Sequence, residues 1–116
     1  MDMEREIVYR CEVASVTAFV QRVAVDLVQH GHWFYVTGTV PPRKDTRAVD
    51  VKLIERYGLA LSKWARARRR AAGEASVQYV RLGRFFVLIA TKGRHAFFER
   101  EPGVHDIRRR PLRVAG

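Results

Sequence analysis

A dense block of positive charge in the second half of the chain is the feature with the clearest chemical meaning. Five cations fall within eight residues: Lys63, Arg66, Arg68, Arg69 and Arg70. Residues 1–60 carry eight Lys and Arg against eight Asp and Glu, whereas residues 61–116 carry fourteen against four, a difference that equals the whole net charge of +10. Cations concentrated on one part of an otherwise neutral chain are typical of a surface that neutralises nucleic-acid phosphate.

We predict that the cations of this half form a band along which a nucleic-acid backbone binds. On the helix expected at 61–72, the outward residues would be Lys63, Arg66, Arg69 and Arg70, with Arg68 nearer the buried edge. Neighbouring strands would extend the band with Arg81, Arg84, Lys92 and Arg94, and the tail would add a flexible clamp of Arg108, Arg109 and Arg110. The pattern does not distinguish DNA from RNA.

Residues 50–70 resemble a helix-turn-helix unit of transcription factors. Such a unit needs apolar residues late in its first helix, a Gly at the turn and inward residues in its second helix. These positions would be filled by Leu53, Ile54 and Tyr57, then Gly58, then Leu59 and Trp64. Ile54 departs from the pattern, which usually has a small residue there. The alternatives are a basic helix that contacts phosphates outside a groove, and two helices that only cover a sheet.

Flat aromatic side chains supply a second candidate surface. Strand alternation over 33–40 would place Trp33 and Tyr35 on one face and Phe34, Val36 and Val40 on the other. Exposed aromatics on a sheet can stack unpaired bases. The segment 84–87 is similar to a fragment of the RNA-recognition strand motif, although the Gly between the cation and the aromatic is missing. A helix or a partner protein covering this face is the alternative.

Two histidines and a tyrosine raise the alternative of a catalytic site. His30-Gly31-His32 is similar to the histidine pair of rolling-circle replication and mobilisation nucleases, for which Tyr57 would be the nucleophile. Those enzymes have a bulky apolar residue between the histidines, within a strand, whereas here a Gly stands at an expected helix end. We therefore predict a non-enzymatic protein with no metal and no cofactor. A nuclease or strand-transferase of a mobile element, a basic adaptor that docks an acidic protein, and a homodimer remain alternatives.

The elements that must position these residues follow from apolar spacing and from capping residues. The strongest is a helix between Ser15 and Gly31, whose apolar residues recur at helical spacing from Val16 to Val28. Pro41-Pro42 ends the strand over 33–40, Thr46 is a candidate helix cap, and Gly58 separates two further helices. The remaining predicted elements are a strand at 7–13, helices at 48–57 and 61–72, strands at 77–82 and 84–91, and a short strand beginning at Phe97-Phe98.

This β-α-β-α-α-β-β order predicts one α+β domain over residues 1–116, with a mixed or antiparallel sheet and helices on one face. A ferredoxin-like variant is the leading candidate. The tail at about 106–116 would be flexible, or an edge strand, or the start of a longer protein. The single Cys11, the acidic N-terminus and the lack of an apolar run of about 20 residues favour a cytoplasmic protein that does not enter a membrane.

The chain as a whole resembles an uncharacterised bacterial family of small basic proteins. The resemblance rests on four segments: 34–38, 52–58, 62–69 and 86–95. It implies no particular activity. It also implies relatives that continue past the position of Gly116.

Overall fold

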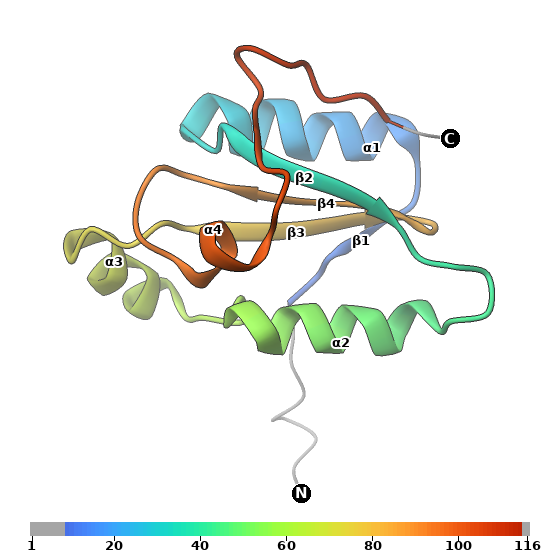
Figure 1. The fold of residues 1–116 in the computed structure, drawn as a ribbon, viewed down its shortest axis with the longest axis horizontal. Helices are drawn as coiled ribbons and strands as arrows, with labels where there is room; N and C mark the ends of the chain where they lie inside the picture. Colours follow the sequence, from blue (N-terminus) through green and yellow to red (C-terminus); the bar gives the residue numbers. More distant parts are fainter. Residues whose placement is uncertain (1–8, 115–116) are drawn as a thin grey trace, which may run out of the picture.

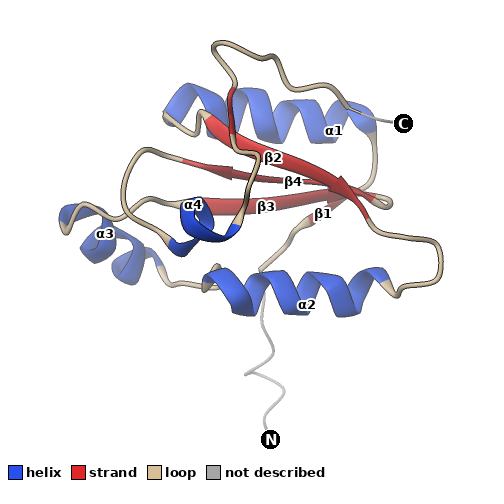
Figure 2. Cartoon of the chain, in the orientation of Figure 1, coloured by secondary structure: helices blue, strands red, loops and turns tan. Residues whose placement is uncertain are grey.

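A five-stranded sheet forms the middle of the protein, and helices pack on both of its faces (Figures 1 and 2). The computed structural model describes residues 9–114. The strands are β1 (Glu12–Val13), β2 (Phe34–Thr39), β3 (Val77–Leu82), β4 (Phe85–Ala90) and β5 (His105–Asp106). Their order across the sheet is β1-β3-β4-β2-β5, with β1 parallel to β3 and the other neighbours antiparallel. The sheet is therefore mixed, as expected.

The first helix begins and ends where the sequence predicts. It starts as α1 (Val16–Val20), continues through a π-helical stretch η2 (Gln21–Leu27) and closes with a 3-10 turn η3 (Val28–His30). The Ser15 hydroxyl accepts a hydrogen bond from the Ala18 N–H at 3.1 Å, and Gly31 ends the helix with a φ of 93°. Ser15 thereby satisfies a backbone donor that would otherwise have no partner in the first turn.

Three more helices follow: α2 (Thr46–Tyr57), α3 (Lys63–Ala71) and α4 (Ala96–Arg100). Asp45, rather than the expected Thr46, caps α2 by accepting from the Arg47 N–H. Gly58 ends α2 in the left-handed conformation, at a φ of 60°. The prediction of a strand beginning at Phe97-Phe98 is wrong, because both residues lie in α4, which His95 caps through its Nδ1.

The helices divide between the two faces of the sheet, which differs from the expected single helical layer. The first helix covers one face, where Phe19 and Val23 pack against Val80 and Val87. The second face is covered by α2 and α4, which contribute Leu53, Tyr57 and Phe97 among others. The α+β class is confirmed, whereas the order of elements departs from the β-α-β-β-α-β of a ferredoxin-like fold.

Both ends of the described chain differ from the prediction: the first strand is shorter than expected, and the C-terminal segment is packed against the fold. Of the strand predicted at 7–13, Glu12 and Val13 pair with β3, while Ile7 and Val8 lie outside the described residues. The segment after β5 runs beside the first helix (Figure 1) and packs Ile107, Leu112 and Val114 into its core; residues 115–116 lie outside the described part. No helix within 9–114 is both long and apolar enough to cross a bilayer.

Candidate nucleic-acid interface

The basic block lies on α3, which stands at one end of the molecule (Figure 1). The Ser62 hydroxyl accepts from the Ala65 N–H at 3.1 Å and starts the helix. Ala and Arg are among the strongest helix formers, and cations near a helix C-terminus interact favourably with its dipole. No residue of α3 is buried, and four of its five cations are exposed while Arg66 is half-buried.

The five cations of α3 are largely unpaired. Arg69 has an acidic partner, because its Nη1 lies 3.8 Å from a carboxylate oxygen of Glu74. The other four cations have none within residues 9–114. Arg68 is exposed, contrary to the expectation that it lies nearer the buried edge. Unpaired, exposed cations retain their full charge for an anionic ligand.

A cleft of about 700 Å³ opens between α3 and the end of the first helix. Arg66 and Arg70 line it from α3, and Lys92 lines it from the loop after β4. Its polar wall consists of His30, His32, Ser76, Gln78 and Thr91, with Asp26 and Glu74 as the acidic members and Trp33 as the large aromatic. Three cations converging on one concave surface make an electropositive cleft, the geometry in which protein fields concentrate anions.

His32 is a structural member of this cleft. It is buried, and its Nδ1 donates to the Leu27 carbonyl at 3.2 Å while its Nε2 lies 3.4 Å from the Ser76 hydroxyl. Burial lowers the pKa of His32, against the effect of the Leu27 hydrogen bond, which raises it. The ring is therefore neutral at pH 7 and links the first helix to Ser76, just before β3, with both of its nitrogens engaged.

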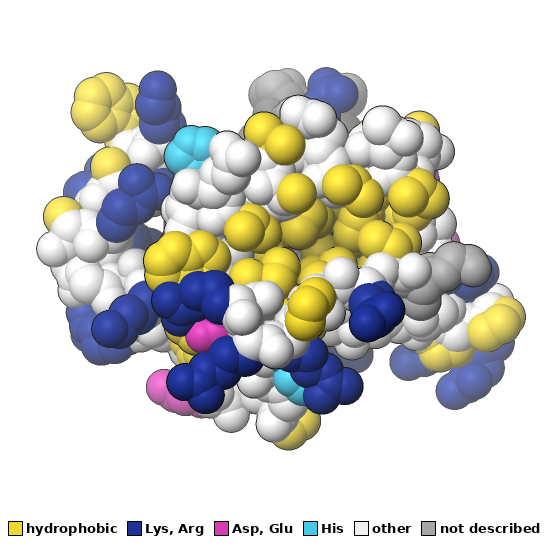
Figure 3. Space-filling model, turned by 90° about the horizontal axis from the view of Figure 1, so that it is seen from above, with side chains coloured by type: hydrophobic (Ala, Val, Ile, Leu, Met, Phe, Trp, Pro, Cys, Tyr) yellow, Lys and Arg dark blue, Asp and Glu magenta, His cyan; other side chains and the backbone are white. Residues whose placement is uncertain are grey.

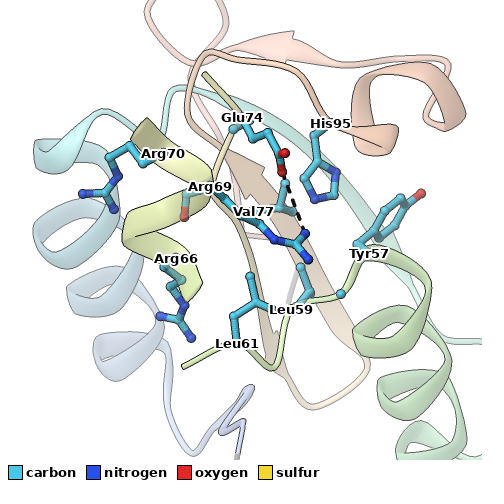
Figure 4. Close-up of a pocket in the computed structure, with 12 residues that line it drawn as sticks. Tyr57, Leu59, Leu61, Arg66, Arg69, Arg70, Glu74, Val77 and His95 are labelled. Carbon is cyan, nitrogen blue, oxygen red and sulfur yellow. Dashed lines mark ion pairs between the residues drawn. The ribbon is translucent and has the colours of Figure 1, made fainter. Parts of the chain in front are cut away.

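A second groove lies on the other side of α3. Figure 4 shows Arg69 reaching toward Glu74, and Arg66 and Arg70 line the same pocket from α3. Desolvation lowers the pKa of His95, whose Nδ1 accepts from the Phe97 N–H at 3.0 Å. Arg66 and Arg70 therefore line both hollows, whereas Lys92 lines only the cleft and Arg69 only the second groove.

The residues of the nuclease alternative are not brought together. His30 and His32 line the cleft, whereas Tyr57 lines the groove on the opposite side of α3. Tyr57 is buried and donates its hydroxyl to a carboxylate oxygen of Glu101. Burial and the Glu101 carboxylate raise the pKa of Tyr57 to about 12, which opposes formation of a phenolate nucleophile. The described residues contain no cluster of three or more His, Cys, Asp or Glu that could hold a metal ion.

Arg81 does not belong to the predicted phosphate surface. Its side chain is buried, with 3% of the residue exposed, and it donates to both carboxylate oxygens of Asp50 at 2.7 Å. Its third nitrogen donates to the Gly83 carbonyl at 2.6 Å. The prediction is wrong because strand alternation turned this side chain toward α2, where a buried carboxylate receives it.

The side chains of Arg84 and Arg94 donate hydrogen bonds to backbone carbonyls. Arg84 donates to carbonyls of the loop after β2, including those of Pro41 at 2.6 Å and Lys44 at 3.0 Å. Arg84 stands at the start of β4, whereas α3 lies near the other end of that strand, about 20 Å away for six residues. Arg94 donates to the Ala72 carbonyl and so satisfies an acceptor at the C-terminus of α3. The basic band expected over the strands is therefore not continuous. Of its four predicted cations, Lys92 is the one that lines the cleft beside α3.

The C-terminal arginines form part of a folded turn. Arg108 donates to both oxygens of Asp106, at 3.0 and 2.7 Å, and its guanidinium lies 4.1 Å from the centre of the Trp33 ring. The Arg109 and Arg110 N–H groups both donate to the Asp106 carbonyl. This segment is therefore held by hydrogen bonds, which differs from the expected flexible clamp, although the side chains of all three arginines are exposed.

The expected stacking platform on β2 is covered. Tyr35 is 4% exposed and donates its hydroxyl to the Arg110 carbonyl at 2.8 Å, because the segment after β5 packs over it. Trp33 is half-buried, with Arg108 against its ring and its indole N–H bonded to the Val28 carbonyl at 3.1 Å. Neither ring offers two free faces to a base.

Among residues 9–114, the most exposed aromatic side chain is that of Trp64 on α3. It was expected to anchor the second helix of a helix-turn-helix unit, but 78% of it is exposed. The local sequence carries a signal for this outcome: the helical neighbours of Trp64 are Ala67, Arg68 and Ala71, so no large apolar residue continues a core-facing stripe.

Comparisons with known proteins add no further information about this site. No family model matches the chain, and neither a curated protein nor a solved structure matches it significantly. The interface is therefore defined by its geometry and charge. Figure 3 shows Lys and Arg side chains over the end of the molecule that carries α3, while apolar side chains gather over the first helix.

Proposed function

We propose that this chain is a non-enzymatic nucleic-acid-binding protein that contacts the phosphate backbone through α3 and the adjoining cleft. The observation that carries the proposal is a capped helix with no buried residue, on which Lys63, Arg68, Arg69 and Arg70 are exposed and Arg66 is half-buried. The loop residue Lys92 faces the same cleft as Arg66 and Arg70. A backbone could therefore follow α3 with cations on both sides of its path.

The contacting set differs from the one that the sequence suggests. It keeps Lys63, Arg66, Arg69, Arg70 and Lys92, and it adds Arg68. Arg81, Arg84 and Arg94 are left out because their guanidinium groups bond to Asp50 or to backbone carbonyls. Arg109 and Arg110 stay as exposed cations on a separate turn.

A salt titration of binding tests this proposal. Each phosphate contact contributes about −0.9 to the slope of log K against log salt on duplex DNA and about −0.7 on a single strand. Six contacts predict a slope of about −5 or about −4, respectively. Fluorescence anisotropy with labelled oligonucleotides between about 50 and 200 mM salt would measure it.

Charge reversal identifies the surface. The double variant Arg66→Glu and Arg70→Glu removes two contacts from the cleft, which should reduce the magnitude of the slope by about 1.8 on duplex DNA or about 1.4 on a single strand and weaken binding at low salt. The matched control is Arg43→Glu with Arg47→Glu, two exposed cations at the opposite end of the molecule. A slope near zero for the natural protein, or equal losses in both double variants, would contradict the proposal.

A further inference from the structure

The most exposed large apolar side chain within residues 9–114 lies on α3, the helix that carries the basic block. Trp64 is 78% exposed, compared with 55% for Val16 and 54% for Val51. Tryptophan is usually well buried, with its N–H bonded, because a large apolar ring left in water carries a free-energy cost. The exposed ring on α3 therefore indicates a ligand that would cover it and remove it from water.

Helix geometry places cations on both sides of that ring. Successive residues turn by about 100° and rise by about 1.5 Å. Relative to Trp64, Ala67 and Ala71 lie within about 60° on the same face, Arg68 lies about 40° to one side, and Lys63 lies about 100° to the other. The two alanines leave the face of the helix open beside the ring. The arrangement is a flat aromatic platform with a cation on each flank.

We propose that Trp64 stacks on an unpaired base, so that the α3 surface prefers single-stranded nucleic acid to a duplex. The proposal rests on the nucleic-acid binding proposed above. Bases of a duplex are stacked on one another and hide their faces, whereas an unpaired base offers its face to an aromatic ring. Lys63 and Arg68 would hold the phosphates on either side of the stacked base, and every base has a face, so the contact is tolerant of sequence.

The composition of α3 favours a nucleic acid over a lipid surface. A helix that lies in a membrane interface needs a broad apolar face of several large side chains. In α3 the other apolar residues are alanines, so that Trp64 alone would enter the bilayer. Cations on both flanks of one ring match a strand that alternates bases with phosphates.

The test compares Trp64→Ala and Trp64→Phe on a short single strand and on the matching duplex. Trp64→Ala should weaken single-strand binding by between about fivefold and about 150-fold, the equivalent of about 1–3 kcal/mol per stacked base, and change duplex binding by less than about twofold. Trp64→Phe should recover most of the loss because the Phe ring still stacks. Val51→Ala, which shortens another exposed apolar side chain, is the matched control.

The fluorescence of Trp64 provides a direct second measurement. In a Trp33→Phe background Trp64 is the sole tryptophan, and a single strand should quench its emission while a duplex leaves it unchanged. The salt slope of Trp64→Ala should equal that of the natural protein, since the ring carries no charge. Preserved circular dichroism of Trp64→Ala would show that the loss does not reflect unfolding.

The outcomes separate this inference from the proposed function. Unchanged affinity of Trp64→Ala for the single strand, with a steep salt slope, overturns the stacking role and leaves the phosphate surface intact. Absence of a salt slope in the natural protein overturns both proposals. A blue shift of Trp64 emission with anionic lipid vesicles, without quenching by single strands, would instead assign α3 to a membrane surface.

Discussion

Replacing Asp50 by Asn is expected to destabilise the fold strongly while leaving every exposed cation in place. Asp50 on α2 accepts from Arg81 at both carboxylate oxygens, and Oδ1 also accepts from the Tyr79 hydroxyl at 2.6 Å. Asp50 is 8% exposed and Arg81 is 3% exposed. The amide that Asp50→Asn introduces keeps one acceptor oxygen but turns an N–H donor toward this cluster, so the buried charge of Arg81 would retain only the exposed Glu12 carboxylate, 3.7 Å away.

Breaking a buried pair by removing one partner costs about 3–5 kcal/mol, a large part of a total stability of about 5–15 kcal/mol. For a domain near 100 residues, each kcal/mol shifts the melting temperature by about 4 °C, so that Asp50→Asn should lower it by about 12–20 °C. Arg81→Met should have a similar effect. The double variant should recover about 2 kcal/mol relative to the sum, because the Tyr79 hydroxyl keeps an acceptor and no unpaired cation remains buried.

The same pair predicts a dependence of stability on pH. Burial by itself raises the pKa of Asp50, but the hydrogen bonds from Arg81 and Tyr79 outweigh it, and the pKa lies below its usual range. The folded state then binds this proton less readily than the unfolded chain, whose Asp pKa is about 3.9. The stabilisation is therefore complete above about pH 5 and is lost as pH falls through the lowered pKa of the folded state.

Urea unfolding of the four proteins at neutral and acidic pH measures these effects. Asp50→Asn should remove the part of the acid sensitivity that belongs to this carboxylate. A loss below about 1 kcal/mol for either single variant, or additive losses in the double variant, would refute the assignment of Arg81 to a buried pair. Arg81→Met measured well below its melting temperature should also keep the salt slope of the natural protein, which distinguishes it from the α3 cations.

Two further predictions follow from local geometry. Gly38→Ala in β2 should destabilise the protein by about 1–3 kcal/mol in thermal unfolding, because an added Cβ would lie 2.5 Å from the Phe86 ring. The control is Gly103→Ala, where nothing lies within 4 Å of the added Cβ, and its stability should stay within about 0.5 kcal/mol of the natural protein. Ser62→Ala should destabilise α3 by about 1 kcal/mol and lower the affinity for a single strand, because it removes the acceptor of the Ala65 N–H. Ser62→Asp should restore the cap. Unchanged affinity and unchanged helical circular dichroism in Ser62→Ala would count against a role of the cap in presenting α3.

The sequence predicts those features that depend on near neighbours along the chain. Ser15 and Gly31 bound the first helix as expected, and Gly58 separates α2 from α3. Capping and left-handed conformations are decided within a few residues, which explains this agreement. The failure at Phe97-Phe98 has the same origin, because a short run of aromatic residues suits a strand as well as a buried helical turn, and the cap by His95 favours α4.

Which residues of the candidate site are exposed depends on contacts between residues far apart in the chain. Charge composition locates the basic block on 63–70, and that location needs no tertiary information. Whether a cation faces solvent depends on what lies across from it. Arg81 meets a carboxylate 31 residues earlier in the chain, and Tyr35 is covered by a segment 75 residues later. No local pattern encodes either contact.

The sequence alone therefore determines that this chain carries a helix dense in positive charge and which residues supply that charge. The tertiary structure decides which of the other cations bond to the fold itself, because their partners lie on helices and loops that packing against the sheet brings into reach. It also decides that Trp64 is the exposed aromatic and that Trp33 and Tyr35 are not. The reason is that α3 projects from the end of the sheet, whereas β2 lies under the chain that follows β5.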